Sequence, residues 1–148
     1  MGVPRKNVSD KHWIYFPDRE FVFYRVGFYS NFLSRRSSQK PTSIYTEVSY
    51  SSYRPLERRN IERKILRDLV RAEILSPKDK ISVKYAVDIK YAYPLYDFDR
   101  QRSIEVIQKF LRENNIYSIG RFGSWEYFSM EDVILQAKDI TRNLDMLP

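Results

Sequence analysis

The sequence has no cysteine, one histidine and only four glycines among its 148 residues. Without cysteine, disulfide bonds, thiolate metal sites and a cysteine nucleophile are all excluded. The single histidine, His12, has no second histidine or cysteine to complete a metal site, so no metal is expected. A Gly-x-Gly-x-x-Gly turn, which binds dinucleotides between a strand and a helix, cannot be assembled from glycines at positions 2, 27, 120 and 123.

Long apolar runs are also missing. No stretch approaches the roughly 18 apolar residues of a membrane span, and the first six residues, MGVPRK, contain no apolar signal core. We therefore expect a cytoplasmic protein without a membrane span. The net charge of +7 could attract anionic partners, but 19 acidic residues are interspersed with 26 basic ones, so the charge does not identify a partner.

Aromatic residues, by contrast, are abundant, at 16% of the chain with twelve tyrosines. Aromatic side chains pack well on a pleated surface, so they favour a substantial sheet. A chain of this length with 43% apolar residues has enough apolar surface to bury a core. We expect one folded domain over residues 1–148.

The apolar pattern predicts the order of the elements. Aromatic runs at 12–16 and 23–28 and a two-residue alternation over 44–50 predict three strands, and the composition of 34–43 predicts an exposed loop. A three-to-four-residue period predicts a first helix over 56–75. Alternation over 81–93 predicts one long strand, or two strands broken by a bulge.

In the last third of the chain, Asp97 or Asp99 can cap a second helix that ends near residues 114–115. Residues 116–119 are predicted to form a short strand that leads into Gly120. The last helix has a clear start, because Ser129 is followed three residues later by Asp132, as in a capping box. Three helices without a regular βαβ alternation predict an α+β fold with a mainly antiparallel sheet.

The stretch 116–132 is the best candidate for a functional site. A glycine at a strand end, here Gly120, lets a ligand approach the backbone closely. The first N–H groups of the helix after Ser129 have no intrahelical acceptor, and they point outward at the positive end of the helix dipole. This arrangement suits a phosphate or another anionic group.

The residues of this stretch resemble the C-terminal part of flavoproteins related to UDP-galactopyranose mutase, protoporphyrinogen oxidase and the amine oxidases. In that family a strand ending in Gly-Arg is followed by an aromatic linker and a helix that begins with Met-Glu or Met-Asp. The matching residues here are Gly120-Arg121, Gly123, Trp125, Tyr127 and Met130-Glu131-Asp132. Segments 12–17, 23–28 and 92–96 also look like parts of the substrate domain of the mutase-like members, so nearly the whole chain is covered.

The resemblance implies the C-terminal part of an FAD-dependent oxidoreductase or mutase-like enzyme, with a substrate-domain-like region over 1–115 and a flavin-contacting strand and helix over 116–148. It places Gly120 and Arg121 near the ribityl and diphosphate groups of the flavin. The start of the last helix, at Met130, Glu131 and Asp132, then faces the pyrimidine edge of the ring. A helix N-terminus there stabilises negative charge on a reduced flavin.

Further side chains could contact a nucleotide-sugar or another small substrate. Aromatic rings can stack on a sugar or on a flavin, but aromatic residues on strands also commonly form the core, and both interpretations stay open. The candidates for substrate contacts are Trp13, Tyr15, Tyr24, Arg25, Tyr93, Tyr96, Trp125 and Tyr127.

Two departures from the family limit these expectations. The missing dinucleotide-binding turn predicts that the chain binds FAD only with a partner that supplies this half. The expected partner is a separate FAD-binding subunit, or the chain forms a homo-oligomer that covers the apolar surface left by the missing half. The mutases have a basic residue between the two linker aromatics and an aspartate before the methionine, whereas this sequence has Glu126 and Ser129. Galactopyranose mutase activity, or any activity of this chain alone, is therefore not expected.

Two other classes of function stay open. The chain could be a non-enzymatic module that binds nucleic acid or a glycan, or a structural remnant that oligomerises. Four arginines at spacing four, Arg59, Arg63, Arg67 and Arg71, form a basic helical stripe, but acidic residues flank it. An ion-paired, solvated face explains the stripe better than phosphate binding does, so nucleic acid is not the expected partner.

Overall fold

The computed structural model describes residues 1–32 and 41–144, and the chain divides into two compact units, Met1–Val87 and Asp88–Pro148. The boundary follows Val87, whereas the sequence suggested a division after residue 115. The expectation of a single domain over 1–148 stays a prediction.

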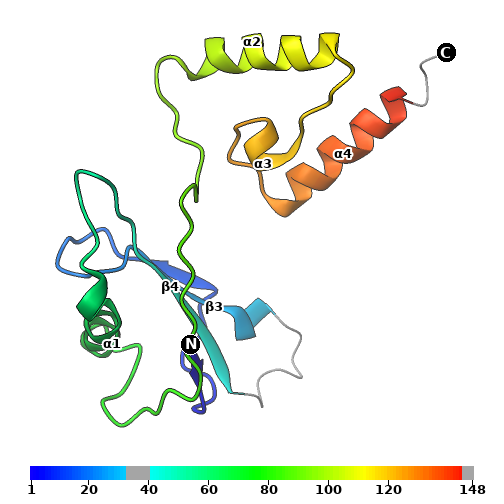
Figure 1. The fold of residues 1–148 in the computed structure, drawn as a ribbon. Helices are drawn as coiled ribbons and strands as arrows, with labels where there is room; N and C mark the ends of the chain where they lie inside the picture. The colour runs from blue at the N-terminus through cyan, green and yellow to red at the C-terminus, as the bar shows by residue number, and fades with distance from the viewer. Residues whose placement is uncertain (33–40, 145–148) are drawn as a thin grey trace. The chain divides into compact units, whose positions relative to one another are not determined.

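The first unit contains a four-stranded antiparallel sheet in the order β1-β4-β3-β2 (Figure 1). The strands are β1 Gly2–Val3, β2 Trp13–Tyr15, β3 Arg25–Phe28 and β4 Thr42–Glu47. Short 3-10 helices lie at Tyr29–Phe32 and Arg58–Asn60. The predicted strands at 12–16, 23–28 and 44–50 are confirmed as β2, β3 and β4, and so is the α+β fold. Of the predicted loop over 34–43, residues 34–40 lie outside the described residues. Thr42 and Ser43 belong to β4.

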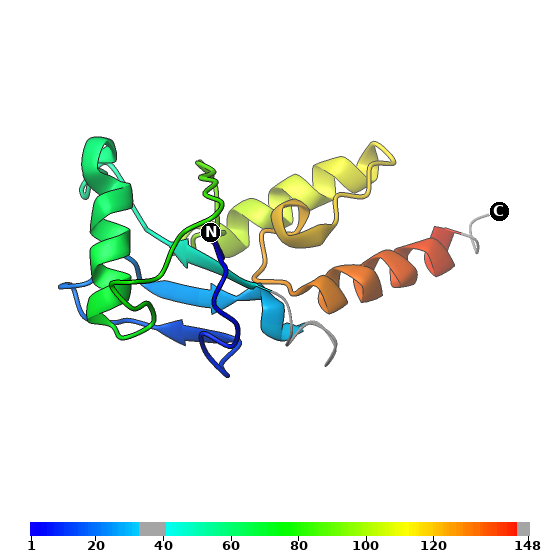
Figure 2. The same cartoon turned by 90° about the horizontal axis from the view of Figure 1, so that it is seen from below.

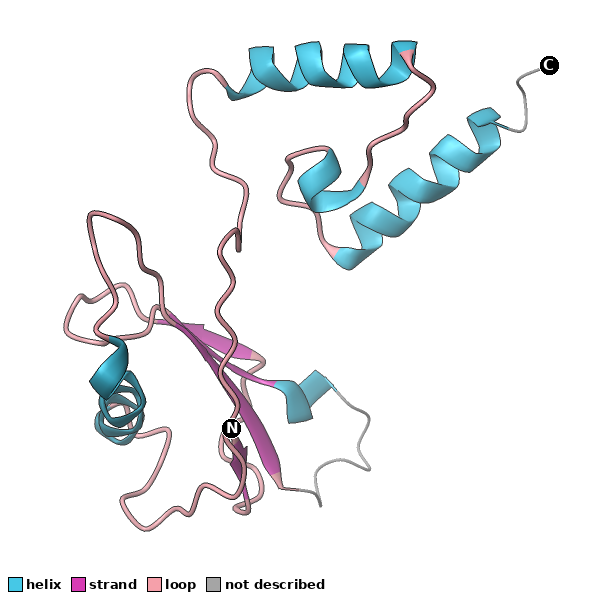
Figure 3. Ribbon diagram, in the orientation of Figure 1, coloured by secondary structure: helices cyan, strands magenta, loops and turns pink. Residues whose placement is uncertain are grey.

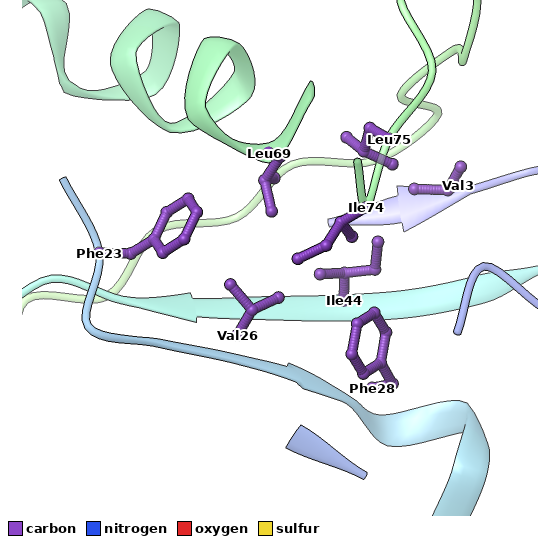
Figure 4. Packing of buried hydrophobic residues seen from close by; sticks show 8 residues of the cluster. All are labelled: Val3, Phe23, Val26, Phe28, Ile44, Leu69, Ile74 and Leu75. Carbon is purple, nitrogen blue, oxygen red and sulfur yellow. The ribbon is translucent and has the colours of Figure 1, made fainter. Parts of the chain in front are cut away.

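Helix α1, Ile61–Arg71, covers one face of this sheet and places Leu69 over it (Figure 4). Alternate residues of β3 and β4 point to this face, because side chains alternate along a strand. The buried cluster consists of Val3, Phe23, Val26, Phe28, Ile44, Leu69, Ile74 and Leu75. The core of the first unit therefore combines strands with one helix.

The first helix is shorter than the predicted range of 56–75. Glu73 takes a left-handed backbone conformation, with φ 59°, just after the helix ends. The N–H groups of Ile74 and Leu75 then both donate to the carbonyl of Leu69, at 3.0 and 3.1 Å. This turn brings Ile74 and Leu75 into the core, and their burial stabilises a helix end at this place.

The prediction of a strand over 81–93 is wrong for most of its length. Val83 alone forms a bridge, to Gly2, with Gly2 N–H donating to the Val83 carbonyl at 2.8 Å. The rest of the segment is drawn as loop in Figure 3. The sequence alternation specifies a face for a strand, but a strand also needs a neighbour, and within residues 1–32 and 41–144 no strand pairs with positions 84–93.

The second unit contains α2 Arg100–Glu113, the short helix α3 Gly120–Gly123 and α4 Met130–Leu144. Figures 1 and 2 both show α3 between α2 and α4. Asp99 holds the N-cap position of α2, as predicted, although its side chain makes no capping hydrogen bond. The predicted strand over 116–119 is wrong, because no neighbouring strand exists in the described part of this unit.

Burial differs sharply between the two units. Pro94 is the only buried residue over positions 88–142. Large apolar side chains of the helices stay exposed, including Val106, Ile107 and Phe110 on α2 and Met130 and Ile134 on α4. A unit of this size that buries so little apolar surface gains little stability from the hydrophobic effect.

The ion pair between Arg5 and Asp79 links the N-terminal segment of the first unit to the loop after α1. Arg5 donates from Nε and Nη2 to the carboxylate of Asp79, at 2.9 and 2.7 Å, and Ser76 N–H donates to the same carboxylate at 2.7 Å. Arg5 Nη2 also donates to the Ile74 carbonyl at 2.9 Å. The hydrogen bonds from Arg5, and then that from Ser76, hold the pKa of Asp79 below its usual value.

This pair predicts a pH dependence of stability. Because the pKa of Asp79 is lower in the folded than in the unfolded state, its stabilising contribution is complete above the unfolded pKa and is lost as the pH falls below about 4. We expect Asp79→Asn to lower the stability of the first unit at pH 7 and to flatten its decrease in acid. Urea unfolding between pH 7 and pH 3 measures both. Asp10→Asn, at an exposed pair with Lys11, is the control and should leave the curve unchanged; equal curves for both variants would contradict the prediction.

Candidate functional site

Side chains from α2 and α4 fix the loop that contains the glycine motif. The amide of Gly120 donates to Gln136 Oε1 at 2.7 Å, and Gln136 Nε2 donates to Ser124 Oγ at 2.7 Å. From the other side, Gln108 Nε2 donates to the Gly123 carbonyl at 2.7 Å. Sequence analysis did not find Gln108 and Gln136, because each acts on residues 12 to 16 positions away and carries no local motif.

Gly120 begins α3 and does not end a strand, which corrects the sequence-based placement. Its φ is +82°, in the region that L-residues rarely adopt. A Cβ at this position would lie 3.7 Å from Val133 Cγ1, which is an ordinary contact. The requirement for glycine therefore comes from the backbone conformation and not from lack of space.

This conformation makes Gly120 a sensitive position. We expect Gly120→Ala to destabilise the turn by about 1–2 kcal/mol, because the left-handed region is unfavourable for a residue with a Cβ. Gly120→Asn should cost less, since asparagine tolerates that region. Amide exchange of the α3 and α4 residues in the two variants compares them. Equal exchange in Gly120→Ala, Gly120→Asn and the unmodified chain would contradict this explanation.

Arg121 ties the loop to the start of α4. Its Nε and Nη2 donate to the carbonyl of Phe128, at 3.0 and 2.7 Å. The guanidinium group also lies 5.6 Å from the centre of the Tyr93 ring, within the range of a cation–π contact. Arg121 thus lies near the start of α4, and two of its nitrogen donors, Nε and Nη2, are already bonded to Phe128.

Three of the aromatic candidates meet beside this loop, and a fourth, Trp125, contacts the segment before α2. The ring centres of Tyr93 and Tyr127 are 5.9 Å apart, and those of Tyr96 and Tyr127 are 5.0 Å apart. Trp125 Nε1 donates to the Leu95 carbonyl at 3.2 Å. Tyr93, Tyr96 and Tyr127 therefore form one aromatic cluster with Arg121. The Trp125 ring instead packs against Phe122, with ring centres 6.1 Å apart.

Glu126, one of the departures from the mutase pattern, lies inside this cluster. Its carboxylate accepts hydrogen bonds from the Tyr96 hydroxyl and from Arg100. The bond from Tyr96, followed by the bond from Arg100, lowers the pKa of Glu126. Arg100, which the sequence analysis also missed, lies 4.2 Å from the centre of the Tyr96 ring and donates to the Trp125 carbonyl at 2.6 Å.

The start of α4 confirms the predicted capping box. Ser129 N–H donates to the Asp132 carboxylate at 2.7 Å, and Asp132 N–H donates to Ser129 Oγ at 3.2 Å. Hydrogen bonds from the Ser129 side chain and then from its backbone lower the pKa of Asp132. The amides of Met130 and Glu131 belong to the first turn, which has no intrahelical acceptors, and both residues are exposed.

The other candidates gather on the outer face of the sheet in the first unit. Arg25 lies opposite both Tyr15 and Glu47 in the strand register. It donates to Tyr15 Oη at 3.2 Å and, from Nε, to Glu47 at 2.8 Å. The Tyr24 hydroxyl also donates to Glu47. Trp13, two residues before Tyr15 on β2, is exposed and stacks on Phe32, with ring centres 6.0 Å apart.

Ion pairs involve two members of the basic stripe. Arg67 pairs with Asp68 at 2.9 Å, and Arg71 pairs with Glu20. Over residues 1–32 and 41–144, no cluster of three or more acidic or histidine side chains could hold a metal ion. In the same part of the chain, no helix is long and apolar enough to cross a membrane.

A solved structure is similar to most of this chain. The structure matches the crystal structure of reduced UDP-galactopyranose mutase with a TM-score of 0.73 and 30% sequence identity over 85% of this chain. The chain is similar to part of that mutase. It spans 27% of the length of the mutase chain. No protein-family model matches the sequence.

The likeness to the mutase confirms one branch of the resemblance found in the sequence. It covers most of the chain, including residues of both units, since neither unit alone amounts to 85% of the length. The wider kinship with protoporphyrinogen oxidase and the amine oxidases stays a prediction. The mutase-like part of the resemblance therefore has support from sequence and from structure.

Proposed function

We propose that this chain is the C-terminal part, or a separate C-terminal subunit, of an FAD-dependent, mutase-like flavoenzyme and that it completes the flavin site. The proposal rests on one observation: the start of α4 follows the Gly120 loop, as in the flavoprotein motif. The chain that contains this arrangement is similar to a mutase over 85% of this chain's length. That the mutase was solved in a reduced form agrees with a redox cofactor. The chain alone has no activity in this proposal.

The residues present fit one part of the proposed flavin contacts well. The first-turn amides of Met130 and Glu131 can donate to an anionic oxygen or nitrogen, and the dipole of the 15-residue helix α4 favours negative charge there. A bound FAD supplies redox chemistry, and these amides would stabilise the reduced ring.

Some of the hydrogen-bond donors of Gly120 and Arg121 are already bonded within the chain and are not free for a flavin. The Gly120 amide already donates to Gln136, so Gly120 would allow close approach without donating a hydrogen bond. Arg121 would contribute its positive charge, since its Nε and Nη2 donate to Phe128. Asp132 would act through the capping box, which holds the helix start in place.

For the substrate, we propose a nucleotide-sugar or another small molecule that stacks on exposed rings. Two surfaces offer such rings, one in each unit. The first has Trp13 and Tyr15 with Arg25 and Tyr24 at the sheet, and the second has the aromatic cluster of Tyr93, Tyr96 and Tyr127, with Trp125 on the same linker. Arg25 is half-buried beside Glu47, which offsets its charge, so stacking contributes more than attraction to phosphate.

FAD binding tests this function. Fluorescence quenching and the visible flavin spectrum are recorded for the chain alone and for a mixture with a dinucleotide-binding polypeptide from the same genome. Binding is expected in the mixture and not in the chain alone, because the chain has no Gly-x-Gly-x-x-Gly turn. An absence of flavin binding in the mixture would overturn the proposal.

Met130 offers a matched pair of variants for the helix start. Met130→Pro removes the amide donor at the first helical position, where proline is well tolerated, and Met130→Ala keeps the amide while removing the same side chain. We expect Met130→Pro to weaken FAD binding by about 10-fold or more, as for the loss of a hydrogen bond to a charged group. Met130→Ala should bind FAD as the unmodified chain does. Equal weakening by both variants would assign the contact to the side chain instead.

A further inference from the structure

A small cavity lies in the first unit between the segment 16–24, which joins β2 to β3, and the loop 49–54 after β4. Its volume is about 60 Å³. Every residue that lines it belongs to the first unit, so the first unit forms the cavity by itself. Sites for whole small molecules or cofactors occupy about 300–1,000 Å³, whereas this cavity has room for a group of a few non-hydrogen atoms. It therefore suits one end of a ligand.

Three phenylalanine rings form an apolar wall of the cavity. Phe16 packs on both Phe21 and Phe23, with ring centres 5.0 Å apart in each pair. Phe23 is buried and extends into the core cluster (Figure 4), so the core holds this wall in place. Such a wall favours a ligand with an aromatic or aliphatic body over a bare ion.

Hydrogen bonds fix the backbone on both sides of the cavity. Val22 N–H donates to the carboxylate of Asp68 at 2.9 Å, and Asp68 is fully buried on α1. On the loop after β4, Ser51 and Arg54 exchange two backbone hydrogen bonds, at 3.0 and 3.2 Å. The cavity is therefore formed before a ligand arrives, which lowers the entropy cost of binding.

Two arginines that line the cavity, Arg19 and Arg54, have side chains without a partner. Neither guanidinium group makes a hydrogen bond, an ion pair or a ring contact with residues 1–32 or 41–144. Asp18 also lines the cavity, so the formal charges of +2 and −1 leave a net charge of +1. This charge matches a single negative charge on a ligand.

The charge and the apolar wall together favour a carboxylate over a phosphate. A guanidinium group binds either one through parallel hydrogen bonds. A phosphate ester carries about 1.5–2 negative charges at pH 7, more than the cavity balances. A carboxylate carries one charge, and an apolar body attached to it can pack on the phenylalanine rings.

We propose that this cavity binds the carboxylate end of a small organic acid, with Arg19 and Arg54 at the carboxylate and the apolar part of the acid on the wall of Phe16, Phe21 and Phe23. The proposed flavin contacts at Gly120, Arg121 and the start of α4 lie in the other unit and take no part in this binding.

Titration of the full chain with benzoate, followed by NMR of the backbone amides, tests the site. Benzoate combines a carboxylate with a ring, and benzamide is its uncharged analogue of the same shape. We expect the amides of 16–24 and 51–54 to shift with a Kd of order 1 mM for benzoate, as for a ligand of this size. Benzamide should bind at least about 10-fold more weakly, because it lacks the charge.

Two results of the titration would overturn the inference. One is the absence of saturable shifts at 16–24 and 51–54 with benzoate. The other is binding of inorganic phosphate at least as tight as that of benzoate, which would assign the cavity to a phosphate group. The titration needs neither FAD nor a partner, so its result does not depend on the proposed function.

Matched arginine variants separate the site from the overall charge of the chain. Arg19→Gln and Arg54→Gln should each weaken benzoate binding at least about 5-fold, as for the loss of a charge-assisted hydrogen bond. Arg63→Gln, at an exposed position on α1, changes the net charge equally and should alter the Kd by about 2-fold or less. All three side chains are exposed, so urea unfolding of the first unit should stay unchanged. Equal weakening by the three variants would assign the binding to net charge and would overturn the inference.

Discussion

Replacing Phe28 by alanine is expected to lower the free energy of unfolding of the first unit by about 3–5 kcal/mol. Phe28 is fully buried, and it lies opposite Ile44 in the register of β3 and β4. The substitution removes the apolar contacts of a whole ring and leaves a cavity that a sheet cannot easily close. With an eight-residue buried cluster, this loss is a large part of the total stability.

Tryptophan fluorescence measures this effect for the first unit alone. In a Trp125→Phe background, Trp13 is the one remaining tryptophan, and it lies on β2 of the first unit. Urea unfolding is then followed for Phe28→Ala and for Phe98→Ala, whose ring is fully exposed in the second unit. Phe98→Ala should leave the transition unchanged. A loss below about 1 kcal/mol for Phe28→Ala would show that the ring is not a core residue.

The second large effect concerns the two units. In the chain alone, we expect the amides of β3 and β4 to have protection factors at least about 100-fold higher than those of α2, since local opening reflects how much structure each region buries. Val26, Phe28 and Ile44 are buried on the strands, whereas no residue of α2 is buried. Helices of this length are marginal without tertiary packing.

Residue-resolved amide exchange of the full chain at pH 7 measures the protection factors. The amides of α1 serve as the internal control, because α1 packs on the sheet through Leu69 and should be protected with β3 and β4. Protection of α2 equal to that of β3 would contradict the expectation. A rise in α2 protection on addition of the partner would agree with a second unit that completes its core on assembly.

A local sequence signal predicted the helix start at the candidate site. The Ser129–Asp132 capping box follows from residues three positions apart, and the structure contains both of its reciprocal hydrogen bonds. The Gly120-Arg121 motif and the linker aromatics lie between α2 and α4, but Gly120 begins α3 where the sequence predicted the end of a strand. What escaped prediction is the framework around them, because Gln108, Gln136 and Arg100 act across 12 to 26 positions.

The sequence by itself determined the features that leave a local pattern. Helices α2 and α4, the strands β2, β3 and β4, the missing dinucleotide-binding turn and the resemblance to mutases could all be identified from periodicity, composition and short motifs. The tertiary structure decided which segments with a strand pattern become strands. Residues 44–47 pair with β3, whereas no strand in the described residues pairs with 84–93 or 116–119. Strand formation depends on hydrogen bonds to distant residues, and no local pattern encodes these bonds.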